Sequence, residues 1–261
     1  MKIVVLVKQV PDSGAERSLR ADDNTVERAT ANNVINEMDE YAIEEALKLR
    51  EAGAGDTEIT ILTMGPEQAA ESIRKALQTG SDGAVHVVDD ALHGSCALAT
   101  SRVLAAALGT LEPDLVLCGA EATDARGQVM PHMLAERLGM AALTGARKLT
   151  VDGSTLTIER QTEEGYEVVT AATPAIVSVW DTINEPRYPT FKGIMEAKKK
   201  PVRTLSLADL GIAADEVGFA GASTEVLEHS RRPARQGGTK VTDDGEGGLR
   251  LVEFLVSEKF V

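Results

Sequence analysis

The chain has 261 residues, a formal net charge of −14, a hydrophobic content of 43% and an aromatic content of only 3%. This length suits one large α/β domain, or one domain with an extension. The acidic balance argues against general nucleic-acid binding, and no apolar run approaches the roughly 18 residues of a membrane-spanning helix, so we expect neither a nucleic-acid ligand nor membrane insertion. The first residues, MKIVVLVKQVPD, lack the cleavage site of a signal peptide and indicate a first buried strand.

Strand-like and helix-like patterns alternate along the first part of the chain. Near-continuous apolar runs, typical of strands buried on both faces of a parallel sheet, occur at 2–8, 57–64, 83–88 and 113–119. Helical spacing follows each run, at 38–52, 67–77, 96–108 and 128–138. This alternation predicts βαβ units, and therefore an α/β fold with a mainly parallel sheet of the Rossmann-like type.

Two segments interrupt this alternation. Residues 9–35 form a long polar excursion, in which DDNT looks like a turn between two short extended pieces. Residues 147–180 contain the strand-like runs RKLTV, TLTIERQ, YEVVTA and PAIVSVW, separated by turn residues that include Asp-Gly and Glu-Gly. Such turns between alternating runs predict antiparallel hairpins, so we expect a β-meander added to the sheet.

The last part of the chain has a different composition. From about Ser206 the sequence is polar, Gly-rich and short of apolar periodicity, and it ends in LRLVEFLVSEKFV, which has the spacing of an amphipathic helix. Such a tail buries little apolar surface by itself. We therefore expect an α/β domain at 1–205 and a C-terminal arm at 206–261 that packs on a partner subunit.

The sequence offers few catalytic or metal-binding motifs. It contains no GxxxxGK[ST], no GxGxxG after the first strand, no GxSxG and no CxxC, and its four His residues lack metal-ligand spacing. Cys96 and Cys118 lie in apolar contexts and fit free thiols in a reducing cytoplasm. We therefore expect no catalytic residues, no metal site and a cytoplasmic protein.

The loops at the carboxyl ends of the predicted parallel strands are better candidates for a binding site, because ligands of open α/β sheets bind there. Such loops follow Val7, Thr63 and Cys118, and another surrounds Asn36. The loop GAEATDARGQVM is small and polar and leads into a predicted helix, whose free N–H groups suit a phosphate near residues 127–129. An ordinary βα loop without a ligand is the alternative.

Several separated stretches resemble the β subunit of electron transfer flavoproteins. The segment IERQTEEGYEVVTAATPAIVS, Ile158 to Ser178, has the pattern of the family signature, and INEPRYPTFKGIMEAKKKPV follows it. The stretches VLVKQVPD, INEMDEYAIEEALKL, GPEQAAESIRKALQTGSD and PDLVLCG match as well. The resemblance covers the chain from about Met1 to Leu210 and, more loosely, the tail.

The resemblance implies an adenine-nucleotide-binding fold in one half of a heterodimer. The partner α subunit would hold most of the FAD, while this chain would bind a structural AMP and carry no chemistry of its own. The implied AMP-binding residues, among which Asp124 and Gln128 are the expected polar side chains, are Leu6, Val7, Asn36, Glu37, Met38, Asp39, Met64, Gly119, Ala120, Glu121, Ala122, Thr123, Asp124, Gly127, Gln128 and Val129. The loop EATDARGQ is a few residues shorter than in many members, so the nucleotide is open between AMP and a second FAD.

The resemblance also implies a recognition loop that docks acyl-CoA and related dehydrogenases. Alignment on NEPRYxT makes Phe191 the apolar anchor, and two Pro residues stiffen the loop, which lowers the ordering cost of binding. The implied recognition residues are Pro189, Thr190, Phe191, Lys192, Gly193, Ile194 and Lys198. Alternatively, Phe191 is a core residue beneath the loop, and 198–200 is a solvated helix end.

Three functions are consistent with these features. The first is an electron carrier subunit that accepts electrons from acyl-CoA-type dehydrogenases in fatty-acid oxidation and delivers them to a quinone oxidoreductase. The second is the β subunit of a bifurcating, NADH-oxidising flavoprotein with a second FAD. The third is a stand-alone adenine-nucleotide-binding regulatory module or ligase, against which the lack of an SGGxD-like loop argues.

Overall fold

The computed structural model describes residues 1–53, 56–231, 233–234, 237–238 and 240–261. Its main sheet has nine strands in the order β11-β5-β4-β1-β6-β10-β7-β8-β9, and all pairings from β11 to β7 are parallel. The strands of this sheet are β1 (Lys2–Leu6), β4 (Glu58–Met64), β5 (Gly83–Val87), β6 (Leu115–Gly119), β7 (Ala141–Asp152), β8 (Thr155–Gln161), β9 (Tyr166–Ala172), β10 (Ala175–Val179) and β11 (Val202–Leu205). The predicted α/β fold with a mainly parallel sheet is confirmed.

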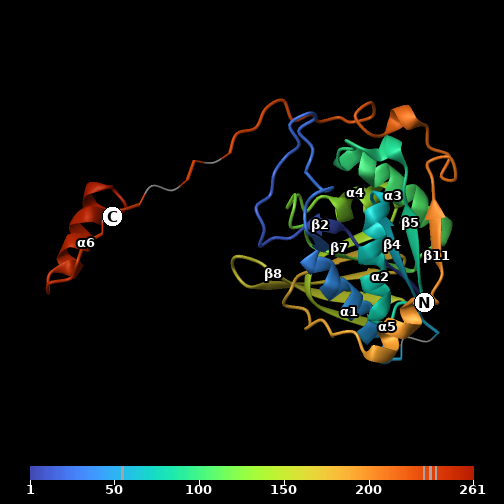
Figure 1. Ribbon diagram of the computed structural model, residues 1–261. Coiled ribbons are helices and arrows are strands. Elements are labelled where there is room, and N and C mark those ends of the chain that lie inside the picture. The colour runs from blue at the N-terminus through green and yellow to red at the C-terminus, as the bar shows by residue number, and fades with distance from the viewer. Residues whose placement is uncertain (54–55, 232, 235–236, 239) are drawn as a thin grey trace. The chain divides into compact units, whose positions relative to one another are not determined.

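Helices cover both faces of the parallel part of the sheet (Figure 1). One core cluster packs α1 (Glu37–Glu51), α2 (Ala70–Gln78) and α5 (Phe191–Ala197) against the strands, and a second packs α3 (Ala97–Leu111) and α4 (Met130–Leu138) against the other face. The core is built almost entirely from aliphatic side chains. Short 3-10 turns lie at η1 (Glu67–Ala69), η2 (Asp90–Leu92) and η3 (Ala214–Glu216).

The antiparallel meander is shorter than we expected. The strands β7, β8 and β9 form antiparallel hairpins, as predicted. The run PAIVSVW, however, is β10, which pairs parallel with β6 on one side and with β7 on the other. All five residues of β10 are buried. The run is therefore a central strand, and its continuous apolar character was the better guide to its pairing than its position after two hairpins.

The excursion at 9–35 begins just after the carboxyl end of β1 at Leu6. Its ends pair as β2 (Gln9–Pro11) and β3 (Asn33–Ile35) in a separate antiparallel sheet. An isolated antiparallel bridge joins Leu19 to Val26, and Asn24 between them has a φ of 56°. The predicted turn between two extended pieces is therefore present, with Asn in the left-handed conformation that this residue tolerates.

The first compact unit extends to Leu227, later than the boundary at residue 205 that the sequence indicated. Leu207 and Val217 are 4% and 0% exposed and belong to the core on the α3 face. Phe219 stacks edge-on against His93 with ring centroids 5.5 Å apart. Residues 206–227 thus complete the core of this unit, although their sequence shows no clear periodicity.

The second unit comprises residues 228–261 and contains α6 (Gly247–Ser257). No residue of α6 is buried, and Leu249, Val252 and Phe254 are about half exposed or more. The expected amphipathic helix is therefore present within this unit. Among the described residues, no helix combines the length and the apolar character needed to cross a bilayer.

Candidate functional site

The strand order reverses at β1, which lies between β4 and β6. The chain moves from β1 to β4 and β5 on one side and then crosses back to β6 on the other. The carboxyl ends of β1 and β6 therefore form the switch point at which open α/β sheets bind their ligands. Leu6, Val7, Met64 and Gly119 all lie at strand ends around this point, as predicted.

Asn36 joins the loops that follow β1 and β6. This side chain is 1% exposed; its Nδ2 donates to the carbonyl of Glu121 at 2.9 Å, and its Oδ1 accepts from the N–H of Thr123 at 3.0 Å. Its own backbone N–H donates to the carbonyl of Lys8 at 2.9 Å. Every strong polar group of Asn36 is thus engaged within the chain, so this residue shapes the site.

Asp39 is the second buried connection between the same loops. One carboxylate oxygen accepts from the N–H of Lys8 at 2.8 Å, and the other accepts from the N–H of Gly119 at 3.1 Å. Burial raises the pKa of Asp39 to about 7, although these hydrogen bonds favour the ionised form. A Cβ at Gly119 would lie 2.5 Å from the Cβ of Met38, so the close approach of α1 to β6 requires Gly there.

Asp124 is buried between two cations. Its side chain is 1% exposed and accepts from Lys8 Nζ at 2.8 Å and from Arg28 Nη2 at 2.5 Å. Burial alone would raise the pKa of Asp124, but the positive charge of Lys8 and the hydrogen bonds from both cations hold that pKa below its usual value. The carboxylate thus orients Lys8 and Arg28 and has no exposed surface of its own to offer a ligand.

The loop between β6 and α4 is strained and open. Arg126 and Gln128 have φ values of 51° and 54°, which are uncommon for residues other than Gly. The structure records no acceptor, among the described residues, for the backbone N–H groups of Gly127, Gln128 and Val129. Helix α4 begins at Met130, two residues later than we expected, because these left-handed residues interrupt the helical backbone. The three N–H groups remain close to the helix start and suit an anion.

The other predicted nucleotide-site residues differ in exposure. Ala120 and Thr123 are buried, whereas Glu37 is exposed and its carboxylate accepts from Ser13 Oγ at 2.8 Å. Glu121 is half-buried and accepts from Gln128 Nε2 at 2.8 Å. Leu6 and Val7 point into the core, so only their backbone could meet a ligand. The structure thus places the predicted residues at the carboxyl edge of the sheet, but several of them are buried or paired within the chain and only support the shape of the site.

Sequence reasoning missed three basic residues at this edge. Lys8 and Arg28 contact Asp124, and Arg17 Nη1 donates to the carbonyl of Thr123 at 2.5 Å. Lys8 could have been found, since it lies two residues after the end of β1. Arg17 and Arg28 lie in the excursion, and no local pattern of the sequence connects them to the loop after β6.

The hollow beside these cations is small. Lys8, Arg28 and Met64 line it, together with Gly65, and its volume is about 90 Å³. Pockets that hold drug-sized ligands have volumes of about 300–1,000 Å³. The edge therefore supplies cations and N–H groups that suit a nucleotide phosphate, while a whole nucleotide would not fit within this hollow.

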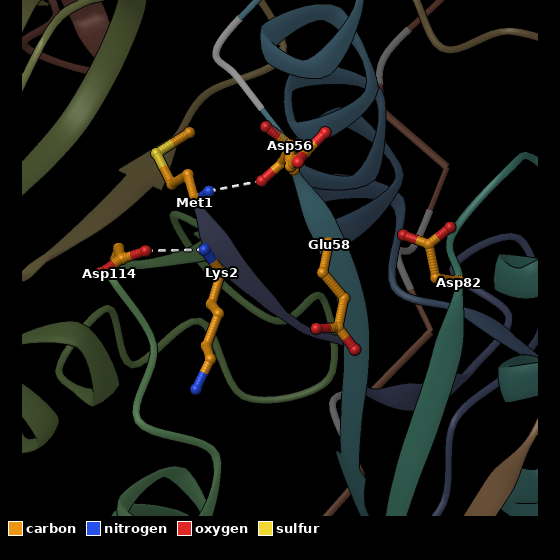
Figure 2. Close-up of a pocket in the computed structure, with 7 residues that line it drawn as sticks. Met1, Lys2, Asp56, Glu58, Asp82 and Asp114 are labelled. Atoms are coloured by element: carbon orange, nitrogen blue, oxygen red, sulfur yellow. Dashed lines mark hydrogen bonds between the residues drawn. The ribbon is translucent and has the colours of Figure 1, made fainter.

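A larger depression of about 380 Å³ lies at the opposite edge of the sheet, near the N-terminus (Figure 2). The side chains of Asp56, Glu58, Asp82 and Asp114 line it. Asp114 accepts from the backbone N–H of Lys2 at 2.7 Å, and the N-terminal ammonium donates to the carbonyl of Asp56 at 2.6 Å. Its acidic lining repels phosphate, so it is not a candidate nucleotide site.

The predicted recognition loop ends in a short, well-capped helix. Thr190 Oγ1 accepts from the N–H of Gly193 at 3.0 Å and so caps α5, which begins at Phe191. Phe191 is 82% exposed and Tyr188 is 93% exposed. Phe191 is therefore not a core residue, and that alternative is wrong. Pro189, Lys192 and Ile194 are exposed on the same segment.

The three lysines after α5 have different surroundings. Lys198 and Lys199 are exposed, whereas Lys200 Nζ donates to the carbonyl of Leu77 at 2.9 Å near the end of α2. A cation at a helix C-terminus is favourable because it faces the carbonyl end of the helix dipole. Lys200 therefore joins α5 to α2, while Lys198 and Lys199 are the lysines that could face a partner.

Comparison with known proteins gives the chain relatives along its whole length. A family model described as an electron transfer flavoprotein domain matches residues 23–210. The chain is 49% identical over 263 residues to electron transfer flavoprotein subunit beta of Mycobacterium tuberculosis, covering 99% of each chain. It is 38% identical over 273 residues to the same subunit of Megasphaera elsdenii, covering 100% of each. It is also 33% identical over 243 residues to caffeyl-CoA reductase-Etf complex subunit CarD of Acetobacterium woodii, covering 93% of this chain and 92% of the relative.

The sheet order and the polar groups at its switch point define an open α/β protein of the kind that binds ligands at its strand ends. The full-length similarity makes the assignment more specific. The chain belongs to the electron transfer flavoprotein family and is a β subunit of that family.

Proposed function

We propose that this chain pairs with an α subunit to form a heterodimeric electron carrier. The carrier accepts electrons from acyl-CoA and related dehydrogenases and passes them to a quinone oxidoreductase. FAD, held mainly by the α subunit, supplies the redox chemistry, and the residues of this chain supply nucleotide binding and docking. The observation that carries the proposal is the identity of 49% to a named β subunit over nearly all of both chains. The free thiols Cys96 and Cys118 favour a cytoplasmic location.

The proposed nucleotide at the switch point is AMP. The N–H groups at 127–129, which have no acceptor among the described residues, would face its phosphate, and Lys8 and Arg28 would supply positive charge nearby. Both cations are held in place by the buried Asp124, so ordering their side chains on binding costs little conformational entropy. The predicted contact through the Asp124 side chain is replaced in this proposal by contacts through those cations.

The proposed docking residue for the dehydrogenase is Phe191. This large apolar side chain is 82% exposed on a capped helix start, so the described part of its own chain covers little of it. The neighbouring Lys192 and Lys198 are also exposed and would meet acidic groups around an apolar pocket of the partner. One anchor of this kind gives affinity without a large, slowly releasing interface.

A second candidate function is supported by one of the relatives. CarD is named as a subunit of a caffeyl-CoA reductase–Etf complex, and it is 33% identical to this chain. In this alternative the chain belongs to a bifurcating, NADH-oxidising flavoprotein and holds a second FAD in place of AMP. Membership of the family removes the motive for a stand-alone nucleotide-binding module or ligase.

Cofactor stoichiometry separates these functions. We expect the chain expressed alone to bind little or no FAD, and the complex co-expressed with its α partner to contain one FAD and one AMP. Flavin absorbance and chromatography of the nucleotides released by denaturation measure both. Stoichiometric FAD on the isolated chain would contradict the proposed division of labour, and two FAD per heterodimer would favour the bifurcating function.

A further inference from the structure

Arg187 lies two residues before Pro189, the first of the proposed recognition residues, and joins this start of the recognition loop to helix α1. Its Nε and Nη2 donate to the two carboxylate oxygens of Glu44 at 2.7 and 2.8 Å, which is a bidentate contact. Its Nη1 and Nη2 donate to the carboxylate of Glu51 at 2.5 and 3.0 Å. Glu44 and Glu51 lie about two helical turns apart on α1. One guanidinium therefore spans much of the second half of this helix.

The contact with Glu44 is stronger than an ordinary surface ion pair. Glu44 is 6% exposed, and a buried carboxylate that lost its cation would be left without adequate solvation. Exposed ion pairs, by contrast, contribute little because water replaces the partner. Asn184 adds a second anchor, since its Nδ2 donates to Glu45 Oε2 and to the carbonyl of Tyr41, both at 3.0 Å.

The other end of the recognition loop is held by α2. A Cβ at Gly193 would lie 2.3 Å from the carbonyl oxygen of Gln78, so α5 lies in backbone contact with the end of α2. Lys200 Nζ donates to the carbonyl of Leu77 at 2.9 Å and closes the same junction. In Figure 1, α5 accordingly lies beside the end of α2.

We propose that Arg187 is a positioning residue for docking, which holds the loop in its binding conformation before the dehydrogenase arrives. The inference rests on the proposed docking role of Phe191. Tyr188 directly follows Arg187, and both Tyr188 and Phe191 are almost fully exposed between the two anchors on α1 and α2. A loop that is already ordered loses less conformational entropy on binding, so each productive contact adds more affinity. Arg187 itself faces α1 and does not need to touch the partner.

The principal test is Arg187→Gln in the assembled heterodimer, measured in a dehydrogenase-coupled assay. We expect the KM for the flavoprotein to rise about fivefold to tenfold, because the freed loop must be ordered on binding. The kcat should stay close to that of the original protein. FAD and nucleotide contents should not change. Arg187→Lys should give an intermediate KM, since an ammonium cannot make the bidentate contacts of a guanidinium.

Arg102→Gln is the matched control. Arg102 forms an ion pair with Glu216, has a similar side-chain exposure of 43% against 36% for Arg187, and lies on α3 at the opposite face of the sheet. We expect this variant to keep the original KM. An equal rise in both variants would show a general effect of losing an arginine and would overturn the proposal.

Glu51→Gln is a second variant that tests the anchor even if Arg187→Gln folds poorly. Glu51 is mostly exposed, so its loss weakens the anchor without burying an unpaired group, and we expect a smaller rise in KM of about twofold to threefold. In a double-mutant cycle, Glu44→Gln and Arg187→Gln should be non-additive in KM, since each removes the same contact. If Phe191→Ala raises KM but Arg187→Gln and Glu51→Gln do not, the positioning role is wrong and docking stands. If Phe191→Ala also has no effect, both proposals fail.

Discussion

Three buried carboxylates in this chain are stabilised in three different ways. Asp39 is held by backbone N–H groups, Asp124 by two cations, and Glu44 by one guanidinium. Neutral N–H groups stabilise a negative charge less than a nearby positive charge does. The pKa of Asp39 is accordingly raised to about 7, whereas that of Asp124 is held below its usual value. Burial raises the pKa of both groups; at Asp39 it outweighs the hydrogen bonds, whereas at Asp124 the two cations outweigh it.

The free energy of unfolding should carry a specific pH dependence from Asp39. Between about pH 4 and pH 7 the folded chain keeps a proton on Asp39 that the unfolded chain has released. The contribution of Asp39 to the free energy of unfolding therefore falls as pH rises through this interval, and it is constant above it. We expect the free energy of unfolding of the original chain, minus that of Asp39→Asn, to decline as pH rises through this interval. Urea unfolding at several pH values measures both.

Asp124→Asn provides the control of opposite sign. Since its folded-state pKa is depressed, Asp124 contributes stability above its unfolded pKa, and this stability is lost as pH falls through the folded value. The free energy of unfolding of the original chain, minus that of Asp124→Asn, should thus increase with pH in the acid range. A pH-independent difference for Asp39→Asn would mean that Asp39 is not the group that titrates.

Removing the side chain of Phe191 should weaken docking and leave folding intact. Loss of a large apolar anchor from a desolvated pocket costs about 2 kcal/mol, which is roughly thirtyfold in affinity. Because Phe191 is 82% exposed in its own chain, we expect the melting temperature of Phe191→Ala to change little. The measurement is the KM for the flavoprotein in a dehydrogenase-coupled assay. Phe191→Leu should nearly restore it, and a strongly lowered melting temperature with normal kinetics would contradict the docking role.

Among the elements, the position of α5 depends on a close backbone contact. This helix has only seven residues and buries only Ala197, so its own length stabilises it little. Its orientation comes from the Thr190 cap, from Lys200 and from the approach of Gly193 to the carbonyl of Gln78. A small shift of α5 would move Phe191 with it, because Phe191 is the first residue of the helix.

We expect Gly193→Ala to displace α5 and to destabilise the chain. The added Cβ would lie 2.3 Å from the Gln78 carbonyl oxygen, and such overpacking costs about 1–3 kcal/mol. Thermal unfolding measures the loss, and the KM in the coupled assay should rise in parallel. Gly109→Ala in α3 is the matched control, since nothing lies within 4 Å of its added Cβ. Helix propensity favours that change by up to about 1 kcal/mol, so equal melting temperatures for the two variants would refute the contact.

At the scale of the whole first unit, α1 connects the two regions that we propose to be functional. Asn36 at its start braces the proposed nucleotide site, and Glu51 at its end receives Arg187 from the recognition loop. A helix of 15 residues is roughly 22 Å long, so the two regions are well separated. Variants of the recognition loop should therefore leave the bound nucleotide unchanged.

The second unit should be needed for pairing and not for the fold of the first. No residue of α6 is buried, and its apolar side chains would gain stability only against another surface. We expect a chain truncated after Leu227 to melt cooperatively at nearly the original temperature but to lose its α partner in gel filtration. Truncation after Leu205 is the contrasting variant, because it also removes Leu207 and Val217 from the core. If the chain truncated after Leu227 still pairs normally, the arm hypothesis is wrong.

Much of the architecture could be predicted because it depends on local patterns. Continuous apolar runs marked β1, β4, β5 and β6, helical spacing marked the helices between them, and Gly turns marked the hairpins β7–β8 and β8–β9. The exposure of the segment around Phe191 was also predicted from sequence, since its Pro residues and its resemblance to a known motif are read along the chain, while its docking role stays a prediction. These features require no knowledge of which distant segments meet.

The pairings of distant segments were decided only by the tertiary structure. The placement of β10 between β6 and β7, the burial of Val217, and the meeting of Arg28 with Asp124 each join parts of the chain far apart in sequence. The cations of the candidate site and the anchor of Arg187 on α1 are of this kind as well. Sequence periodicity reports which face of an element is apolar, but it does not report which partner covers that face. The sequence by itself therefore determined the elements and the family, and the packing of the sheet decided which charges meet at its edge.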